Sequence, residues 1–306
     1  MSAASAAVPA PSPSDRRRRL RAGLASGTIQ RFPGAFSPLV ARAVTDHGFE
    51  GVYVSGSVLA ADLCLPDVGL TTSVEVAHRG GQIARVTDLP VLIDADTGFG
   101  EPANVARTVN LLEDAGIAGC HLEDQVNPKQ CGHLEGTVVV ERDEMVRRIR
   151  AAVLGRRDPE FVICARIDAR GVEGFDAALE RAKAYVDAGA DMVFPEALAD
   201  EAEFAAFRAA IDVPLMANMT EFGKGPSLRV DQLQDLGVDL VIWPVTTLRV
   251  ALGGVDDTLA ALATDGLQSA VLGRMQPKER TDRLVGYPAH QALERAVAGT
   301  ADERRA

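Results

Sequence analysis

The sequence predicts an α/β fold, a (β/α)8 TIM-type barrel, on the basis of two observations. Beyond residue 28, eight short apolar runs alternate with longer amphipathic stretches. Continuous apolar strands joined by helices are typical of parallel sheets that are covered on both faces. Polar side chains close most of these runs, and in a barrel the strand ends meet at the face where active sites lie. A doubly wound sheet is the alternative.

The expected strands and helices alternate in chain order. We expect strands at residues 29–36, 51–57, 89–100, 118–125, 161–168, 191–197, 213–220 and 238–245. Amphipathic helical patterns, such as residues 101–116 and 175–190, separate them. Three of these helices run into Gly116, Gly189 and Gly237, and glycine just past a helix end is the expected stop signal.

One large domain lies between two short tails. Residues 1–14, rich in Ala, Ser and Pro, are expected to be disordered. Residues 15–290 are predicted to form a single (β/α)8 barrel domain with a C-terminal helical extension, and residues 291–306 a frayed tail. The basic run at residues 16–19 is interpreted as the solvated start of a helix.

The composition argues against several classes of partner. A net charge of −11 disfavours nucleic acid, and no apolar run reaches the ~18 residues that would span a membrane. The four cysteines lack the paired spacing of zinc sites or disulfide frameworks, so we expect a cytoplasmic protein. Cys64, Cys120 and Cys164 are expected to pack in the core, whereas Cys131 lies in a polar, glycine-flanked segment.

Acidic side chains at the strand ends indicate a metal site. Asp94 and Asp96 alternate along one expected strand, so both carboxylates face the same side. A pair of carboxylates suits a hard cation such as Mg²⁺, which keeps several of its waters. Glu123 and Asp67 are the candidates to complete the shell.

An arginine at a strand end is a candidate for binding a substrate carboxylate. Arg166 follows a run of apolar and small residues, and a buried arginine needs an anionic partner. A structural ion pair is the alternative interpretation. Arg249 is a second candidate, with a surface position as its alternative.

The segment "PKQCGHLEG" contains a candidate general acid–base residue. Lys129 and His133 flank Cys131 and would favour its thiolate, bringing the pKa toward neutrality. A group that titrates near pH 7 can give and take protons. We therefore predict that Cys131 is catalytic and that its loop closes over bound substrate.

A series of ordered motifs resembles a known family. "YVSGS", "LPDVGLTT", "IDADTGFG", "HLEDQVNPKQCGH", "CARID", "FPEA", "ANMTEFG" and "WPVTTLR" together resemble the isocitrate lyase/phosphoenolpyruvate mutase superfamily, over about residues 20 to 290. The Lys-x-Cys-Gly-His loop is similar to that of its carbon–carbon lyases, and "ANMTEFG" in a short chain is similar to its 2-methylisocitrate lyases. The resemblance implies cleavage of 2-methylisocitrate, a tricarboxylate 2-hydroxy acid of propionate catabolism, to pyruvate and succinate.

The resemblance also implies roles for individual residues. It implies catalytic roles for Cys131, Tyr53, His133 and Glu123. It implies substrate contacts from Ser55, Gly56, Ser57, Gly132, Arg166, Glu196, Asn218, Met219, Thr220, Arg249 and Lys278. It implies that Asp94 and Asp96 bind Mg²⁺ or Mn²⁺ directly, with Asp67 and Glu123 helping through water. It further implies a homotetramer in which the C-terminal helices are swapped between subunits.

Three positions depart from the pattern of that group. Gln130 and Thr137 replace cationic residues, and Lys278 replaces an arginine. These departures leave open a lyase for dimethylmalate or another 2-hydroxy diacid, or an oxaloacetate-type decarboxylase. A phosphonate mutase or hydrolase of the same superfamily is the next alternative, and a non-catalytic binding barrel is the last.

Overall fold

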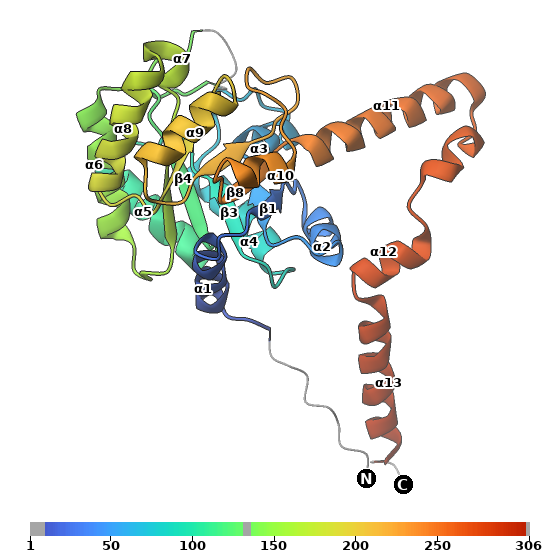
Figure 1. The fold of residues 1–306 in the computed structure, drawn as a ribbon. Helices are drawn as coiled ribbons and strands as arrows, with labels where there is room; N and C mark the ends of the chain where they lie inside the picture. The colour runs from blue at the N-terminus through green and yellow to red at the C-terminus, as the bar shows by residue number, and fades with distance from the viewer. Residues whose placement is uncertain (1–9, 131–135, 304–306) are drawn as a thin grey trace. The chain divides into compact units, whose positions relative to one another are not determined.

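The computed structural model describes residues 10–130 and 136–303. Contacts within the chain divide it into two units, Met1–Leu248 and Arg249–Ala306, and each is described by itself. The first unit holds all the strands that were expected from the sequence (Figure 1).

Each of the eight predicted strands is confirmed, in shorter form. The strands are β1 (Gln30–Pro33), β2 (Val52–Val54), β3 (Val91–Asp94), β4 (Gly119–Glu123), β5 (Val162–Ile167), β6 (Met192–Pro195), β7 (Met216–Asn218) and β8 (Leu240–Trp243). They form two parallel sheets, in the orders β1-β8-β7 and β2-β3-β4-β5-β6. Single parallel bridges, Gly34 to Tyr53 and Val193 to Leu215, lie between the end strands of the two sheets.

Helices follow the strands, as the alternation in the sequence predicts (Figure 1). In the first unit they are α1 (Pro13–Leu24), α2 (Pro38–Asp46), α3 (Gly56–Asp62), α4 (Ser73–Ala84), α5 (Pro102–Asp114), α6 (Arg142–Gly155), α7 (Arg170–Glu173), α8 (Phe175–Asp187), α9 (Glu201–Ala210) and α10 (Val230–Asp235). The stop signals at Gly116, Gly189 and Gly237 are confirmed, because all three adopt positive φ, which favours glycine.

Two buried clusters divide the strand side chains by alternation. The inner cluster contains residues of the strands together with Leu20 and Leu24 of α1: Phe32, Tyr53, Leu92, Ala118, Val162, Cys164, Met192, Phe194, Met216, Leu240 and Ile242. The outer cluster contains the intervening strand residues and the apolar faces of the helices. Successive side chains of a strand point to opposite faces, so the inner and outer faces of each strand are defined by these two clusters.

Two arginines of the basic run at the start of α1 are buried, whereas the sequence interpretation expected solvated side chains. Arg16 and Arg17 are 9% and 5% exposed. Arg16 donates to the carbonyls of Ala84 and Thr87, and Arg17 donates to the carbonyl of Ile117 and pairs with Asp158 at 2.8 Å. These guanidinium groups satisfy buried carbonyls that would otherwise lack a donor.

The second unit is helical and exposes much apolar surface. It contains most of α11 (Thr246–Asp265), the 3-10 helix η1 (Ser269–Arg274), α12 (Lys278–Leu284) and α13 (Tyr287–Glu303). Val271 and Leu284 are its buried hydrophobic residues among the described side chains. Many others are exposed: Val250, Leu252, Val255, Leu259, Leu262, Leu267, Leu272, Met275, Val285, Tyr287, Leu293 and Val297. Among the described residues, no helix is both long and apolar enough to cross a membrane.

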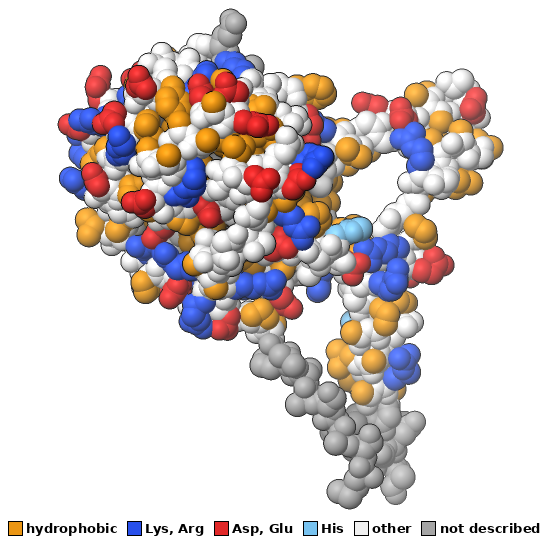
Figure 2. Space-filling view, viewed as in Figure 1, with side chains coloured by type: hydrophobic (Ala, Val, Ile, Leu, Met, Phe, Trp, Pro, Cys, Tyr) orange, Lys and Arg blue, Asp and Glu red, His pale blue; other side chains and the backbone are white. Residues whose placement is uncertain are grey.

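Surface charge on the first unit is mixed. Figure 2 shows acidic and basic side chains interspersed over the face in view, with apolar side chains between them.

Candidate active site

The candidate site lies at the carboxyl ends of the strands, on their inner face. Along β3, Leu92 packs in the inner cluster and Asp94 continues the same face, and Asp96 follows in the turn after the strand. Along β5, Cys164 is followed on that face by Arg166. The same change from apolar to polar ends the other inner series: His121 and Glu123 on β4, Glu196 after β6, and Asn218 and Thr220 at β7. The expected gathering of polar residues is therefore present.

Asp94 and Asp96 form a buried acidic pair. Each is 4% exposed. Asp94 accepts the backbone N–H groups of Gly56, at 3.2 Å, and of Asp96, at 3.0 Å. Asp96 adopts a φ of 47°, in the left-handed region that aspartate tolerates better than most residues. A side chain at Gly56 would meet the pair, because an added Cβ would lie 3.0 Å from one oxygen of each carboxylate.

Lys129 supplies a positive charge to this acidic pair. Its ammonium lies 2.5 Å from Asp67 Oδ1 and 3.0 Å from Asp96 Oδ1, and the lysine is 4% exposed. The contact with Asp96 is an ion pair without hydrogen-bond geometry, since the same Asp96 oxygen has no hydrogen-bond partner. The sequence interpretation assigned Lys129 to the activation of Cys131, whereas the structure engages its ammonium with carboxylates.

The two carboxyl groups of the acidic pair have different pKa values. Burial raises the pKa of Asp96 to about 6, against the opposing charge of Lys129. Burial also disfavours ionised Asp94, but His121, Lys129 and Arg166 lower its pKa to about 2. We assign that lowering to Lys129 and Arg166, because burial lowers the pKa of His121 and leaves its ring neutral. When two carboxyl groups lie close together and the pKa of one is raised, a further positive charge beside them stabilises the ionised form of both.

Tyr53 and His121 form a buried polar pair beside the acids. The Tyr53 hydroxyl lies 2.7 Å from His121 Nε2, and the rings are stacked with centroids 5.9 Å apart. His121 Nδ1 lies 3.6 Å from Asp94 Oδ1 and has no hydrogen-bond partner. Burial raises the pKa of Tyr53 well above its ordinary value, which favours the neutral phenol over a phenolate base.

Arg166 lies among three carboxylates. Its guanidinium donates twice to Asp168, at 3.0 and 2.8 Å, and lies 3.3 Å from Glu123 and 3.7 Å from Glu196. The Phe194 ring lies 5.4 Å away and adds a cation–π contact. The structural ion pair that was the alternative interpretation of Arg166 is therefore present, and the position at the inner face also leaves it beside the acidic pair.

Glu123 is fully buried and incompletely bonded. It is 0% exposed, and neither of its carboxylate oxygens has a hydrogen-bond partner. Burial raises its pKa well above the ordinary value, although Arg166 opposes this. The ion pair with Arg166 at 3.3 Å compensates this carboxylate only in part, and a buried carboxylate without hydrogen bonds costs free energy, so its oxygens are suited to a further positively charged or hydrogen-bonding ligand.

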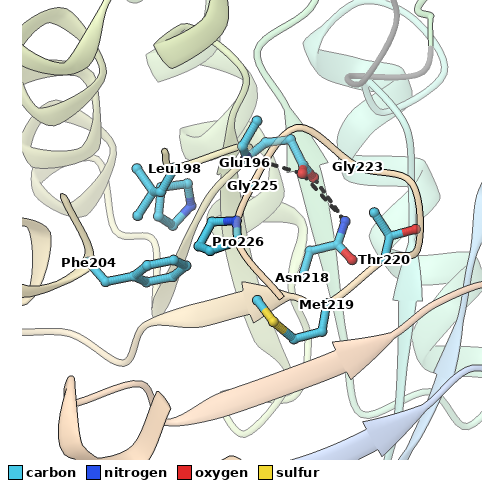
Figure 3. A pocket seen from close by; sticks show the side chains of 11 residues that line it. Glu196, Leu198, Phe204, Asn218, Met219, Thr220, Gly223, Gly225 and Pro226 are labelled. Atoms are coloured by element: carbon cyan, nitrogen blue, oxygen red, sulfur yellow. Dashed lines mark hydrogen bonds between the residues drawn. The ribbon is translucent and has the colours of Figure 1, made fainter. Parts of the chain in front are cut away.

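Glu196 and Asn218 border a pocket between the ends of β6 and β7. The amide of Asn218 donates to both carboxylate oxygens of Glu196, at 3.4 and 3.3 Å (Figure 3). Thr220 contributes a hydroxyl to the lining. The apolar part of the lining comes from Leu198, Phe204, Met219 and Pro226. This pocket thus joins a polar edge to an apolar wall.

The remaining expected site residues fall into three groups. The Ser55 hydroxyl accepts the N–H of Val58 and caps α3, and Ser57 lies in the first turn of that helix. Cys131, Gly132 and His133 lie outside the described residues. Arg249 and Lys278 belong to the second unit, where the Lys278 ammonium lies 2.5 Å from Asp282 Oδ2. Their contacts with substrate stay predictions.

The sequence interpretation missed Asp168 and the contacts of Lys129 with the acidic residues, and it was wrong about one cysteine. Asp168 is 5% exposed and binds Arg166, and its position two residues after Arg166 on an alternating strand was a signal that could have found it. Cys64 is exposed, not packed in the core, whereas Cys120 and Cys164 are buried as expected. Cys64 has a φ of 57° in the turn after α3, and this turn directs it away from the core.

The donor set fits a divalent cation. Ionised Asp94, buried Asp96 with an oxygen that lacks a hydrogen bond, and Glu123, whose oxygens also lack hydrogen bonds, offer the oxygen ligands that Mg²⁺ and Mn²⁺ prefer. The ammonium of Lys129 already provides positive charge at the same carboxylates. Within the described part of the chain, however, no three His, Cys, Asp or Glu side chains are close enough to form a complete metal shell. Most of the ligands would therefore be water or substrate.

Comparison with known sequences identifies a family. The family model of phosphoenolpyruvate phosphomutase matches residues 20–263. A Corynebacterium glutamicum protein described as "Probable 2-methylisocitrate lyase 2" is 63% identical over 285 residues, which are 93% of each chain. A 2-methylisocitrate lyase of Aeropyrum pernix is 46% identical over 271 residues, which cover 89% of this chain and 87% of that protein.

Comparison with solved structures gives the same superfamily. An oxaloacetate acetylhydrolase in complex with 3,3-difluorooxalacetate is similar with a TM-score of 0.88 and 32% identity, over 94% of this chain and 99% of that chain. A phosphonopyruvate hydrolase in complex with oxalate and Mg²⁺ is similar with a TM-score of 0.83 and 30% identity, over 91% of this chain and 98% of that chain.

Proposed function

Because this chain belongs to the phosphoenolpyruvate phosphomutase family, we propose that it cleaves 2-methylisocitrate to pyruvate and succinate with the help of a divalent cation. The names of its relatives make it a carbon–carbon lyase. The observation that best supports the proposal is the buried acidic pair, Asp94 and Asp96, beside buried Arg166 on one inner face.

Mg²⁺ or Mn²⁺ is the proposed cofactor. Asp94 and Asp96 would hold it directly, with Asp67 and Glu123 holding its waters. When bound, the cation would polarise the α-hydroxy acid part of the substrate and lower the pKa of its hydroxyl. The oxalate and Mg²⁺ in the phosphonopyruvate hydrolase complex are consistent with such a site for a small 2-oxo acid.

The proposed reaction is a retro-aldol or retro-Claisen cleavage. A base removes the substrate hydroxyl proton, a lone pair of the resulting alkoxide oxygen forms the second C–O bond of the pyruvate carbonyl, and the adjacent C–C bond breaks. Its electron pair passes to the succinate fragment, where it is delocalised into a carboxylate until carbon is protonated. We propose Cys131 as the acid for that protonation, with a catalytic role also for His133, two residues later in the sequence.

The other side chains hold the substrate. We propose that Arg166 binds a substrate carboxylate, since its guanidinium retains donors beyond those that bind Asp168. Neutral Tyr53 would act as a hydrogen-bond donor that holds His121, because its pKa is raised. We propose that Ser55, Gly56 and Ser57 at the start of α3 contact the pyruvate-side carboxylate, with the Ser57 N–H as the backbone donor because the Gly56 N–H already donates to Asp94. We assign further substrate contacts to Gly132, Glu196, Asn218, Met219, Thr220, Arg249 and Lys278.

Gln130 and Thr137 suggest weaker binding of the succinyl end. Losing a buried charged hydrogen bond to a carboxylate costs roughly 1.5–3 kcal/mol. If the substrate reaches these positions, Gln130→Arg will raise kcat/KM for 2-methylisocitrate, and Gln130→Leu is the uncharged control. An unchanged kcat/KM in the arginine variant would count against this role for Gln130.

The assembly is also proposed rather than observed. We propose that the eight strands close as a full barrel. The bridges Gly34–Tyr53 and Val193–Leu215 are consistent with this closure. The exposed apolar side chains of the second unit exceed what a free helical segment in water favours. Covering them in a homotetramer, with C-terminal helices swapped between subunits, would bury this surface.

Pyruvate release tests the proposed reaction. Purified protein is assayed with 2-methylisocitrate and Mg²⁺, with lactate dehydrogenase and NADH reporting pyruvate. Isocitrate and dimethylmalate are run alongside, and EDTA and Cys131→Ser are the controls. We expect pyruvate from 2-methylisocitrate that is lost with EDTA, restored by excess Mg²⁺, and lowered at least about 100-fold in Cys131→Ser. Turnover of dimethylmalate but not of 2-methylisocitrate would reject the proposed substrate.

A further inference from the structure

A second buried polar group lies behind the candidate site, on the outer face of the strands. Asp124 follows β4 directly and is 0% exposed. Glu123 faces the inner site, so alternation turns the next side chain to the opposite face. Asp124 Oδ1 accepts the backbone N–H of Asp168 at 2.8 Å, and its Oδ2 accepts the hydroxyl of Tyr185 at 2.9 Å.

Helix α8 supplies both other members of this group. Arg181 and Tyr185 are four residues apart and therefore lie on the same face of the helix. Arg181 Nη1 lies 3.6 Å from Asp124 Oδ2 and donates to the Tyr185 hydroxyl at 3.1 Å. Its Nε and Nη2 donate to the two carboxylate oxygens of Glu173, each at 2.7 Å. The guanidinium is thus held from both sides.

The same group fixes the chain that returns toward the site at residues 138–140. The carbonyl of Asp124 accepts the N–H of Val140 at 2.8 Å, and Arg181 donates to the carbonyl of Val140 at 2.9 Å. Gln125 and Val139 form an antiparallel bridge beside them. Asp124 therefore joins two segments at the site, the turn with Asp168 and the strand-like residues 138–140.

We propose that Asp124, Tyr185 and Arg181, the outer triad, are positioning residues for the proposed lyase reaction. This inference rests on the proposed function. The triad acts through Asp168: Asp124 fixes the backbone of Asp168, whose carboxylate binds the Arg166 guanidinium at 3.0 and 2.8 Å. The orientation of Arg166 toward a substrate carboxylate therefore depends on residues that do not face the site.

The hydrogen bonds of the triad can be removed without changing the packing of the ring that makes them. The Tyr185 ring packs in the outer cluster whether or not its hydroxyl is present, so Tyr185→Phe removes two hydrogen bonds and keeps the apolar volume. The loss frees Asp124 Oδ2 from its donor and Arg181 Nη1 from one acceptor. Small displacements of a positioned group lower catalysis strongly, because the reaction needs a precise arrangement.

A double-mutant cycle tests the proposal. Tyr185→Phe is combined with Arg166→Lys, and kcat/KM for 2-methylisocitrate is measured for all four proteins. We expect Tyr185→Phe alone to lower kcat/KM about 10-fold, and to lower it less than about 2-fold when Arg166 is already lysine. Equal losses in both backgrounds, or no loss in the wild-type background, would overturn the proposal.

Two further arms separate the outcomes. Asp158→Asn is the matched control, since it removes a part-buried ion pair with Arg17 away from the site; it should lower the melting temperature without a comparable loss of kcat/KM. Asp124→Asn replaces Tyr185→Phe if the latter folds poorly, with the same expected coupling to Arg166.

Binding of a product does not depend on turnover. Calorimetric titration with succinate or pyruvate in Mg²⁺ should show the same coupling between Tyr185→Phe and Arg166→Lys in the dissociation constant. If the wild type binds a product but leaves 2-methylisocitrate intact, the proposed substrate is wrong. The coupling in the dissociation constant then still tests the role of the triad. A wild type that binds neither product would overturn both proposals.

Discussion

Gly56→Ala should weaken cation binding without unfolding the protein. The added Cβ would lie 3.0 Å from Asp94 Oδ2 and 3.0 Å from Asp96 Oδ1, whereas ordinary contacts begin at 3.4 Å. The two carboxylates must therefore move apart by a few tenths of an ångström, and the N–H bond from residue 56 to Asp94 shifts with them. Disturbing groups that orient metal ligands typically costs 10–100-fold in affinity, which corresponds to roughly 1.4–2.7 kcal/mol.

Two measurements distinguish this effect from a loss of fold. Calorimetric titration with Mg²⁺ gives the dissociation constant without substrate, and the melting temperature should stay within about 2 °C because alanine favours a helix more than glycine does. Gly171→Ala is the control, since its added Cβ has no neighbour within 4 Å. An unchanged Mg²⁺ dissociation constant in Gly56→Ala would refute the assignment of Asp94 and Asp96 to the cation.

Two other predictions concern the arginine and the N-terminal helix. Arg166→Lys should lower kcat/KM for 2-methylisocitrate by at least about 100-fold, because a lysine cannot reproduce the bidentate contact with Asp168; a loss below fivefold in the coupled assay would contradict this. Burial opposes ionisation of Asp158, but hydrogen bonds from Ser14 and Arg17 lower its pKa to about 2. Its ionised form therefore adds stability above its ordinary pKa that is lost as the pH falls toward 2. Urea unfolding should show wild type about 1–2 kcal/mol more stable than Asp158→Asn at pH 6, with a difference that shrinks below pH 4; a constant difference would refute the linkage.

Strand alternation explains why so much of the candidate site was visible in the sequence. Asp94 and Arg166 lie on the inner face of β3 and β5, and Asp96 and Asp168 follow each of them by two residues, just beyond the strand end, where they reach the same end of the sheet. The apolar residues before them, such as Leu92, identify that face as the inner one. Local spacing alone therefore indicated both the position of the site and the sign of its charges.

Contacts between distant segments could not be read in the same way. Lys129 reaches Asp67 across 62 residues and Arg17 reaches Asp158 across 141. Both cations occur in polar stretches of the sequence, where a solvated side chain is the ordinary expectation. Their burial becomes evident only when the fold brings buried carbonyls or carboxylates next to them, so their roles needed the structure.

Asp124 shows where closeness in the sequence misleads and alternation does not. Glu123 and Asp124 are adjacent acids at the end of one strand, and proximity in sequence suggests a shared role. The strand directs them to opposite faces, so one lies 3.3 Å from Arg166 at the inner site and the other binds Tyr185, 61 residues later on α8. An acid that follows an inner-face acid is therefore better tested for a partner on the covering helix than for a metal. In this chain that partner connects helix α8 to the orientation of Arg166.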